Sequence, residues 1–232
     1  MTEYRHEYKY YIPTQKLLCI KNQIEPIMFR DMHVGNDESY TIRSLYFDDY
    51  ENSGFYENEN GVDPREKFRL RIYNGDASLI KLELKQKYMG KTRKQSCIIP
   101  QALCESIING NNYFAADIDS PVYRKFYIQQ TTKFLRPKVI VEYERIPYIY
   151  PDGNVRITFD LNIRSCINIR SFLAPNIMTR SVMPTGQNIL EVKFDELLPD
   201  FIHQSVQTEK LQQTNFSKYY ICRKYNLGGT SL

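Results

Sequence analysis

The sequence predicts an α+β fold in which about eight antiparallel strands form a barrel with helices packed outside. Eight segments rich in Tyr, Ile, Val and Phe alternate apolar and polar residues, a pattern typical of strands with one buried face. Fewer stretches favour helices. The 232 residues contain no internal repeat and no Gly/Ser/Pro-rich linker, so we expect a single domain over residues 1–232, with an ordered core of about 3–225.

Turn residues separate several of the expected strands. Asn74-Gly75-Asp76 and residues 151–154 have the chemistry of hairpin loops, and Met89-Gly90-Lys91 is a third candidate. The strands expected between these and other breaks are 3–12, 39–49, 65–74, 77–88, 92–99, 137–149, 154–164 and 187–195.

The expected helices begin at residues that favour helix starts. Thr14 can cap a helix over 14–25, and Ser120 followed by Pro121 is an N-cap with proline at the first helical position of 121–134. Pro100 can open a short helix that ends near Asn109-Gly110. The stretch 199–225 is predicted to form one or two further helices.

The composition excludes several classes of protein. A formal net charge of +4 is too small to indicate a nucleic-acid or membrane partner by itself. No run of about 18 apolar residues is present, and residues 1–7 do not resemble a signal peptide. The five cysteines are scattered and never spaced as CxxC, which favours a reducing cytosol over a disulfide framework or a zinc site. We therefore expect a cytoplasmic protein that does not insert into a membrane.

Charged residues gather on one face of several expected strands. Side chains of the same parity share a strand face, so two or three ionised residues stand in line on each of five strands, opposite a row of apolar residues. Eleven Lys and Arg then accompany three Glu on these faces and nearby segments: Arg5, Lys9, Lys67, Arg69, Arg71, Lys81, Lys85, Arg145, Arg156, Lys193 and Lys218, with Glu7, Glu83 and Glu191.

Two interpretations of these rows are open. If the charged faces point outward, the barrel has an apolar centre and an ordinary solvated surface. If they point inward, helices must cover the apolar outer faces and the lumen is a cationic tunnel. Like charges persist in such a lumen only with water, carboxylates and a multiply charged anion. We expect the inward arrangement, with the segments 14–25 and 121–134 as part of the outer cover.

Short motifs spread along nearly the whole chain resemble those of a known family, and they occur in the same order as in that family. The set comprises residues 5–10 (RHEYKY), 42–48 (IRSLYFD), 67–73 (KFRLRIY), 82–85 (LELK), 141–145 (VEYER), 156–160 (RITFD), 189–194 (ILEVKF) and 216–219 (FSKY). These resemble VTC domains, the polyphosphate polymerase domain of the vacuolar transporter chaperone complex. The resemblance implies the CYTH-like triphosphate tunnel fold, transfer of the terminal phosphate of ATP to a growing polyphosphate chain, and dependence on a divalent metal, Mn²⁺ or Mg²⁺.

The resemblance also implies roles for individual residues. Basic tunnel residues that act on the phosphates match Lys9, Arg69, Arg71, Lys85, Arg145, Arg156 and Lys218. Tyr143 and Ser217 match phosphate-contacting positions, and Lys94 or Arg93 stands for a further basic one. From the strand faces we add Arg5, Lys81 and Lys193 as substrate-binding residues. Glu191 matches the metal carboxylate, with Glu7 or Glu83 in support because hard oxygen ligands suit these ions.

Other functions stay open at this point. A CYTH-like triphosphatase and a non-catalytic polyphosphate-binding module use the same basic lumen. The first strand has Arg5-x-Glu7-x-Lys9 where CYTH hydrolases have Glu-x-Glu-x-Lys, and one carboxylate fewer argues for the polymerase. Asp160 is expected to pair with Arg156 rather than bind metal. We expect ATP and polyphosphate as ligands and no nucleic acid, while a separate membrane partner and the oligomeric state stay open.

Overall fold

A computed structural model of the protein describes residues 4–31, 34, 37–111, 114–206, 211–215 and 217–228. Its regular elements follow the predicted alternation of many strands and few helices. In chain order they are β1 (His6–Pro13), α1 (Thr14–Ile24), β2 (Phe29–Arg30), β3 (Tyr40–Asp48), α2 (Ser53–Glu59), β4 (Arg65–Tyr73), β5 (Asp76–Tyr88), β6 (Lys91–Ile99), α3 (Gln101–Ile108), α4 (Pro121–Thr132), β7 (Arg136–Tyr150), β8 (Val155–Cys166), β9 (Arg180–Ser181), β10 (Gln187–Phe194), α5 (Asp200–Val206) and α6 (Lys218–Asn226).

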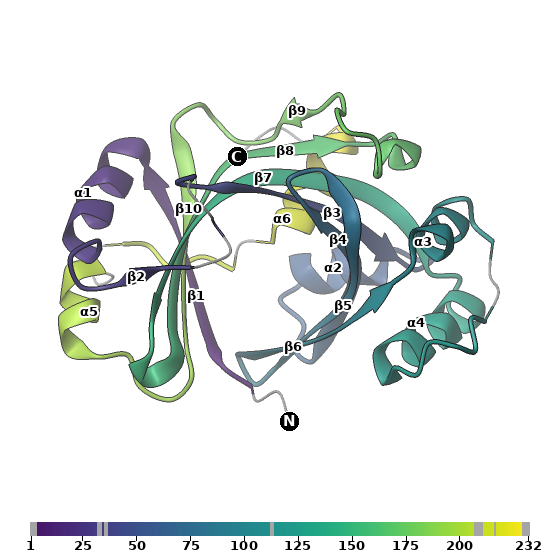
Figure 1. The fold of residues 1–232 in the computed structure, drawn as a ribbon, viewed down its shortest axis with the longest axis horizontal. Helices are drawn as coiled ribbons and strands as arrows, with labels where there is room; N and C mark the ends of the chain where they lie inside the picture. Colours follow the sequence, from purple (N-terminus) through teal and green to yellow (C-terminus); the bar gives the residue numbers. More distant parts are fainter. Residues whose placement is uncertain are drawn as a thin grey trace.

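Eight long strands form one curled antiparallel sheet (Figure 1). They follow the order β1-β10-β8-β7-β3-β4-β5-β6, and the short strands β2 and β9 pair with β7 and β8. The two edge strands approach each other where Arg5 and Thr92 exchange two backbone hydrogen bonds of 2.9 Å each. The predicted eight-stranded antiparallel barrel with external helices is confirmed, as a curled half-barrel whose edges meet at the bridge between Arg5 and Thr92.

The hairpins form where the turn residues predict them. Asn74 and Gly75 both have positive φ, 52° and 69°, which lets a short turn join β4 to β5. Gly153, in the loop between β7 and β8, has φ 73°, and a Cβ added there would lie 2.6 Å from the Leu197 carbonyl oxygen. Only glycine fits this position, because both the backbone angle and the close approach exclude a side chain.

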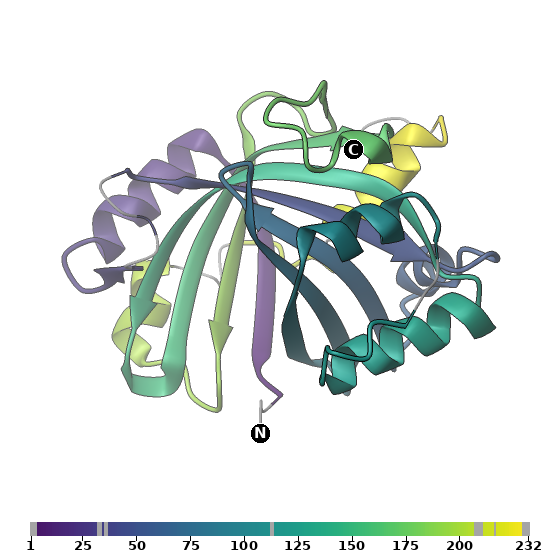
Figure 2. The same cartoon turned by 45° about the vertical axis from the view of Figure 1, so that its right-hand side comes forward.

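Helices cover the outer, apolar face of the sheet on both sides (Figure 2). α3 and α4 pack over β4, β5 and β6, where Phe68, Leu82 and Phe126 belong to one buried cluster. α1 and α5 pack over β1, β8 and β10, where Ile20 and Ile157 belong to a second cluster. None of the helices in the described part of the chain is long and apolar enough to cross a membrane.

α6 lies against the opposite, concave face. Its Tyr219 and Ile221 pack in a third buried cluster with Tyr46 of β3 and Val139 and Val141 of β7. These strand residues share a face with the charged rows, because Tyr46 pairs directly with Arg69 in the β3–β4 ladder. α6 therefore fills part of the space inside the sheet. Its first residue, Lys218, lies next to charged residues of the concave face, Asp160 and Glu191.

Several local predictions need correction. Thr14 does not cap α1; Pro13 holds the N-cap position without a side-chain bond, and the Thr14 hydroxyl instead donates to the Gly186 carbonyl at 3.1 Å. Ser120 does cap α4, accepting from the Tyr123 amide. The stretch 199–225 contains α5 and α6, with residues 207–210 and 216 outside the described part. α2, β2 and β9 were not predicted.

The outer cover can be tested on two residues of α4. Phe126 is 0% exposed and packs against Phe47 and Phe68, whereas Ile128 on the same helix is 56% exposed. We expect Phe126→Ala to lower the free energy of unfolding by about 3–5 kcal/mol through loss of burial and creation of a cavity. Ile128→Ala, the matched control, should change it by no more than about 0.5 kcal/mol. Urea unfolding measures both, and equal effects would show that α4 does not seal the sheet.

Candidate functional site

The charged rows point inward, into a cavity of about 360 Å³ enclosed by the curled sheet. Twelve of the twenty described residues that line it are Lys or Arg, and only two are carboxylates, Glu7 and Glu191. The remaining lining residues are Tyr, Thr or Ser. The twelve are Arg5, Lys9, Lys67, Arg69, Arg71, Lys85, Arg93, Lys94, Arg145, Arg156, Lys193 and Lys218. We call this space the central cavity.

Glu83 of β5 orients the two arginines of β4. Its side chain is 0% exposed and accepts from Arg69 at 2.7 Å, while Arg71 and Lys94 lie 3.6 and 3.2 Å away. The other side of the Arg69 guanidinium donates to the Tyr46 hydroxyl at 2.9 Å. Burial disfavours the charged Glu83 carboxylate, but Arg71, Arg69 and Lys94 outweigh it and hold its pKa well below the usual value. The arginines are thus fixed in direction before any ligand arrives.

A second network joins β7, β8, β10 and α6. Arg145 donates two bonds to Asp160, of 2.6 and 2.7 Å, and a third of 3.3 Å to Glu191. Lys218 lies 2.5 Å from Asp160 and 2.7 Å from Glu191. Burial alone would lower the pKa of Lys218, but these two carboxylates raise it, so the ammonium stays charged.

The predicted pairing of Asp160 with Arg156 is wrong. Arg156 instead donates to Asp31 at 2.7 Å and to the Tyr40 hydroxyl at 3.3 Å. The cause is strand register: in the β7–β8 ladder Asp160 stands directly opposite Arg145, whereas Arg156 stands opposite Ile149 near the end of the strand.

Glu7 of β1 is the centre of a lysine cluster. Lys85 lies 2.5 Å from its carboxylate, Lys9 3.4 Å and Lys193 3.9 Å. Glu7 and Glu191 share Lys9 and Lys193 as partners, whereas the ion pairs of Glu83 involve neither lysine. Within the described ranges no three His, Cys, Asp or Glu side chains form a group that could hold a metal ion by themselves.

The remaining predicted residues take different places. Tyr143 accepts from Arg71 at 3.4 Å, and Lys218 lies 4.8 Å from its ring centroid. Ser217 lines the cavity as the N-cap of α6, accepting from the Tyr220 amide. Arg5 lines it, with the Asp195 carboxylate 3.8 Å away. Lys81 is not among the lining residues, and its ammonium lies 5.4 Å from the Tyr73 ring centroid.

Some residues that line the central cavity had no role assigned from the sequence. Lys67 was placed on the charged face of its strand with Arg69 and Arg71 but was not assigned a role toward the substrate, and it lines the cavity. Tyr40, Tyr46 and Tyr73 also line the cavity. No local pattern separated these from the many tyrosines that pack in strands.

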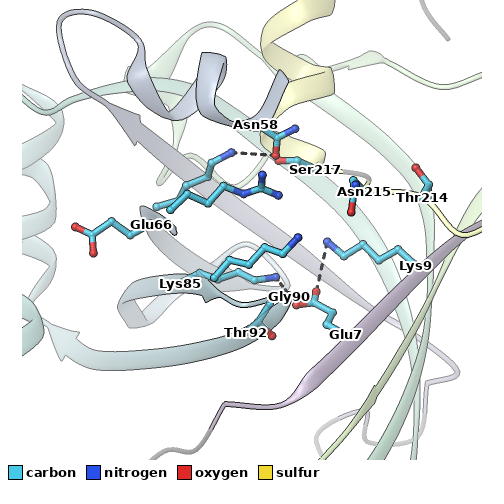
Figure 3. Close-up of a pocket in the computed structure, with 13 residues that line it drawn as sticks. Glu7, Lys9, Asn58, Glu66, Lys85, Gly90, Thr92, Thr214, Asn215 and Ser217 are labelled. Atoms are coloured by element: carbon cyan, nitrogen blue, oxygen red, sulfur yellow. Dashed lines mark hydrogen bonds and ion pairs between the residues drawn. The ribbon is translucent and has the colours of Figure 1, made fainter. Parts of the chain in front are cut away.

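A smaller pocket of about 100 Å³ adjoins the central cavity (Figure 3). Lys9 and Lys85 point toward Glu7 on one side of it, and Asn58 and Ser217 lie on the other. We call it the side pocket, and its described lining residues are Glu7, Lys9, Asn58, Arg65, Glu66, Lys67, Lys85, Lys87, Gly90, Thr92, Thr214, Asn215 and Ser217.

Two lysines shared by both spaces are strongly desolvated. Burial lowers the pKa of Lys67 to about 7, and no carboxylate among the described residues lies within ion-pair distance of its ammonium, which donates to Asn58 at 3.4 Å. Burial also lowers the pKa of Lys85 to about 7, against the opposing effect of Glu7. A group that gives up its proton because too few anions surround it will regain that proton when an anion binds.

The comparisons with known proteins agree with this geometry. A family model described as the VTC domain matches residues 4–226. The chain belongs to the VTC domain family. No curated protein matches it.

Two solved structures resemble this VTC domain in fold. A putative adenylate cyclase from Bacillus halodurans is 13% identical, with a TM-score of 0.54 over 93% of this chain and 95% of the other. A putative adenylyl cyclase from Hippeastrum, described as having a dominant triphosphatase activity, is 12% identical, with a TM-score of 0.56 over 95% and 96%. The VTC domain therefore shares its fold with these two proteins.

The desolvated lysines predict a pH dependence of anion binding. Lys67 is about half neutral near pH 7, so binding of inorganic triphosphate above this pH must draw a proton from solution. We expect affinity to fall as pH rises from 7 to 9, at most about tenfold per unit for each such lysine. Lys67→Arg keeps its charge throughout and should lose that part of the slope, while the titration of the ligand itself affects both proteins equally. Calorimetry at several pH values measures this, and identical profiles would contradict it.

Proposed function

We propose that this VTC domain is a metal-dependent polyphosphate polymerase, which transfers the terminal phosphate of ATP to the end of a polyphosphate chain inside the central cavity. The observation that carries the proposal is the excess of fixed positive charge. Twelve Lys and Arg line the cavity. Their carboxylate partners among the described residues are six: Glu7, Asp31, Glu83, Asp160, Glu191 and Asp195. A phosphate chain carries the charge that would balance the remainder.

The arrangement of these groups suits phosphoryl transfer, which depends on positioning and charge neutralisation. Arg69 and Arg71 are neighbours on one strand face and present planar guanidinium groups, which bind phosphate oxygens in pairs. Glu83 holds them from the side. Lys218, held by Asp160 and Glu191, adds a fixed ammonium at the start of α6, where the backbone amides also favour an anion.

The donor set fits a divalent ion that also takes oxygens from the substrate. Mg²⁺ in proteins is commonly held by one or two carboxylates together with phosphate oxygens, and Glu7 and Glu191 supply two carboxylates around shared lysines. The pKa values of both are held well below the usual range, although burial opposes ionisation, because Lys193, Lys9 and other cations outweigh it. When bound, Mg²⁺ or Mn²⁺ would neutralise charge on the phosphates. Glu83, the third carboxylate expected near the metal, is assigned here to orienting Arg69 and Arg71 and not to binding the ion.

The lowered pKa values of Glu7 and Glu191 argue against these two carboxylates as the base for attack by water, which leaves the desolvated Lys67 and Lys85 as the groups of the cavity that a hydrolysis would use. Water must lose a proton to attack, and a carboxylate whose pKa is far below 7 is a poor base for this. The end of a phosphate chain is already anionic and requires no base. A triphosphatase is the second candidate, because the Hippeastrum protein of the same fold is described with that activity.

The location of this protein in a reducing cytosol, which the scattered cysteines favour, stays a prediction.

Product analysis separates these functions. The purified domain is incubated with ATP and Mn²⁺, and the products are resolved by gel electrophoresis and phosphorus NMR. Chains that lengthen with time while ADP accumulates support the polymerase. Free phosphate without chains would show a triphosphatase, and no turnover despite tight binding would show a binding module.

Two matched substitutions test the role of the β4 arginines. Arg71→Lys keeps the charge but removes the planar fork, so we expect turnover to fall by about a hundredfold. Arg124→Lys makes the same change on the outer helix α4, where Arg124 pairs with Asp119, and should leave turnover within about twofold. Steady-state rates and unfolding midpoints are measured for both. A loss of turnover shared by the two variants, or absent from both, would contradict the assignment.

A further inference from the structure

One buried carboxylate of the concave face forms no ion pair with the described part of the chain. Asp48, the last residue of β3, is 3% exposed, and no described Lys, Arg or His side chain lies within 4 Å of its carboxylate. Glu83 and Glu191, by contrast, each have at least three such partners. A buried carboxylate without a cation is costly unless other donors bind it.

Four hydrogen-bond donors surround Asp48 in place of cations. Its Oδ1 accepts from the backbone amides of Asp49 and Gly54, at 3.0 and 2.9 Å. Its Oδ2 accepts from the amide of Phe55 at 3.0 Å and from the Tyr219 hydroxyl. The chain passes so close that a Cβ on Gly54 would lie 3.1 Å from Oδ1. The amides belong to the segment that opens α2 and the hydroxyl to the first turn of α6, so Asp48 fixes these two helix starts relative to each other.

The two helices that Asp48 joins hold the ammonium of Lys67 between them. This ammonium donates to the Asn58 side chain of α2 at 3.4 Å, and it lies 4.8 Å from the centroid of the Tyr219 ring of α6. Asn58 lines the side pocket (Figure 3). Because no described carboxylate lies within ion-pair distance of Lys67, the amide of Asn58 and the ring of Tyr219 are what direct it.

We infer that Asp48 is a positioning residue: by holding α2 and α6 together it keeps the Lys67 ammonium directed into the central cavity, where Lys67 binds a phosphate of the substrate. Asp48 itself is not among the described lining residues of either space, so it acts through Asn58 and Tyr219. A free lysine loses side-chain entropy when it binds a ligand, and a lysine that is already held loses less. The inference rests on the proposed function in that Lys67 meets phosphate.

The charge of Asp48 also acts on Lys67. Burial lowers the pKa of Lys67 to about 7 and the cation of Arg65 lowers it further, whereas the Asp48 carboxylate opposes both and does so more strongly than Glu57. The titratable and charged groups that face Lys67 from the elements around it are Lys9 of β1, Asp48 of β3, Arg65 and Arg69 of β4, Lys85 of β5, Glu57 of α2 and Tyr219 of α6.

Two neighbouring tyrosines of α6 test the positioning. Tyr219→Phe keeps the ring but removes the bond to Asp48. Tyr220→Phe, the matched control, removes a hydroxyl that donates to the exposed Glu59 side at 2.9 Å. Calorimetry with inorganic triphosphate measures both in the full chain. We expect the affinity to fall about three- to tenfold for Tyr219→Phe and to stay within about twofold for Tyr220→Phe.

A double-mutant cycle shows whether the effect passes through Lys67. In a protein that already carries Lys67→Met, the change Tyr219→Phe should weaken triphosphate binding by no more than about twofold, because the lysine that it positions is gone. The same loss with and without Lys67 overturns the inference, since the hydroxyl would then act through Lys218 or through the stability of α6. Unchanged affinity of Tyr219→Phe overturns it as well.

The pH profile of triphosphate binding gives a readout that a merely structural role would not move. Asp48→Asn keeps the size of the side chain and removes its charge, so the pKa of Lys67 should fall and the loss of affinity with rising pH should begin at a lower pH. In a Lys67→Arg background, which keeps Lys85, the same change should leave the shape of the profile unaltered, because arginine does not titrate in this range.

A purely structural Asp48 predicts a different result: affinity that falls equally at every pH and in both backgrounds, which overturns the inference. If Asp48→Asn does not fold, the cycle of Tyr219 and Lys67 decides alone. These readouts depend on binding and not on turnover. A protein that shows the coupling but makes no polyphosphate keeps the positioning role and refutes the polymerase, whereas a wild type that does not bind triphosphate refutes both.

Discussion

The structure depends on buried ion pairs on the concave face of its sheet. Glu7, Glu83, Asp160 and Glu191 are each almost completely buried, and each has at least two Lys or Arg partners within 4 Å. Removal of such groups from water costs several kcal/mol for each ion unless partners compensate. These carboxylates are what allows a sheet to turn its cations inward, and their number is smaller than that of the cations. The remaining positive charge is what gives the cavity its chemistry.

The rest of the architecture follows from the inward direction of the charged strand faces. With the charged faces inside, the apolar faces of the same strands point outward and need a cover, which α3 and α4 provide on one side and α1 and α5 on the other. α6 packs against the concave face, and it places Lys218 against Asp160 and Glu191. Tyr219, the next residue, donates to the buried Asp48 carboxylate, which also accepts from the amides of Gly54 and Phe55. The end of β3, the start of α2 and the start of α6 are thereby tied together at the wall of the cavity.

Strand content and the shared face of each charged row could be predicted from the sequence because both are local, whereas the inward direction was expected from the excess of like charge along the rows. Alternation along β4 places Lys67, Arg69 and Arg71 on one face whatever the neighbouring strands are. Pairing between strands could not be predicted in this way. Asp160 pairs with Arg145 because of the register of β7 and β8. From the sequence of its own strand, Asp160 was expected to pair with Arg156 instead. Thr14 shows a similar limit, since its hydroxyl bonds to Gly186, 172 residues away.

The most direct measurement is a crystal structure of the protein grown with inorganic triphosphate and Mn²⁺. The account predicts a triphosphate inside the central cavity, with its oxygens on Arg69, Arg71 and Lys218 and the metal against Glu191. A triphosphate bound only to lysines on the outer surface, with the cavity holding water alone, would contradict the central claim that the inward charge is a site for phosphate chains.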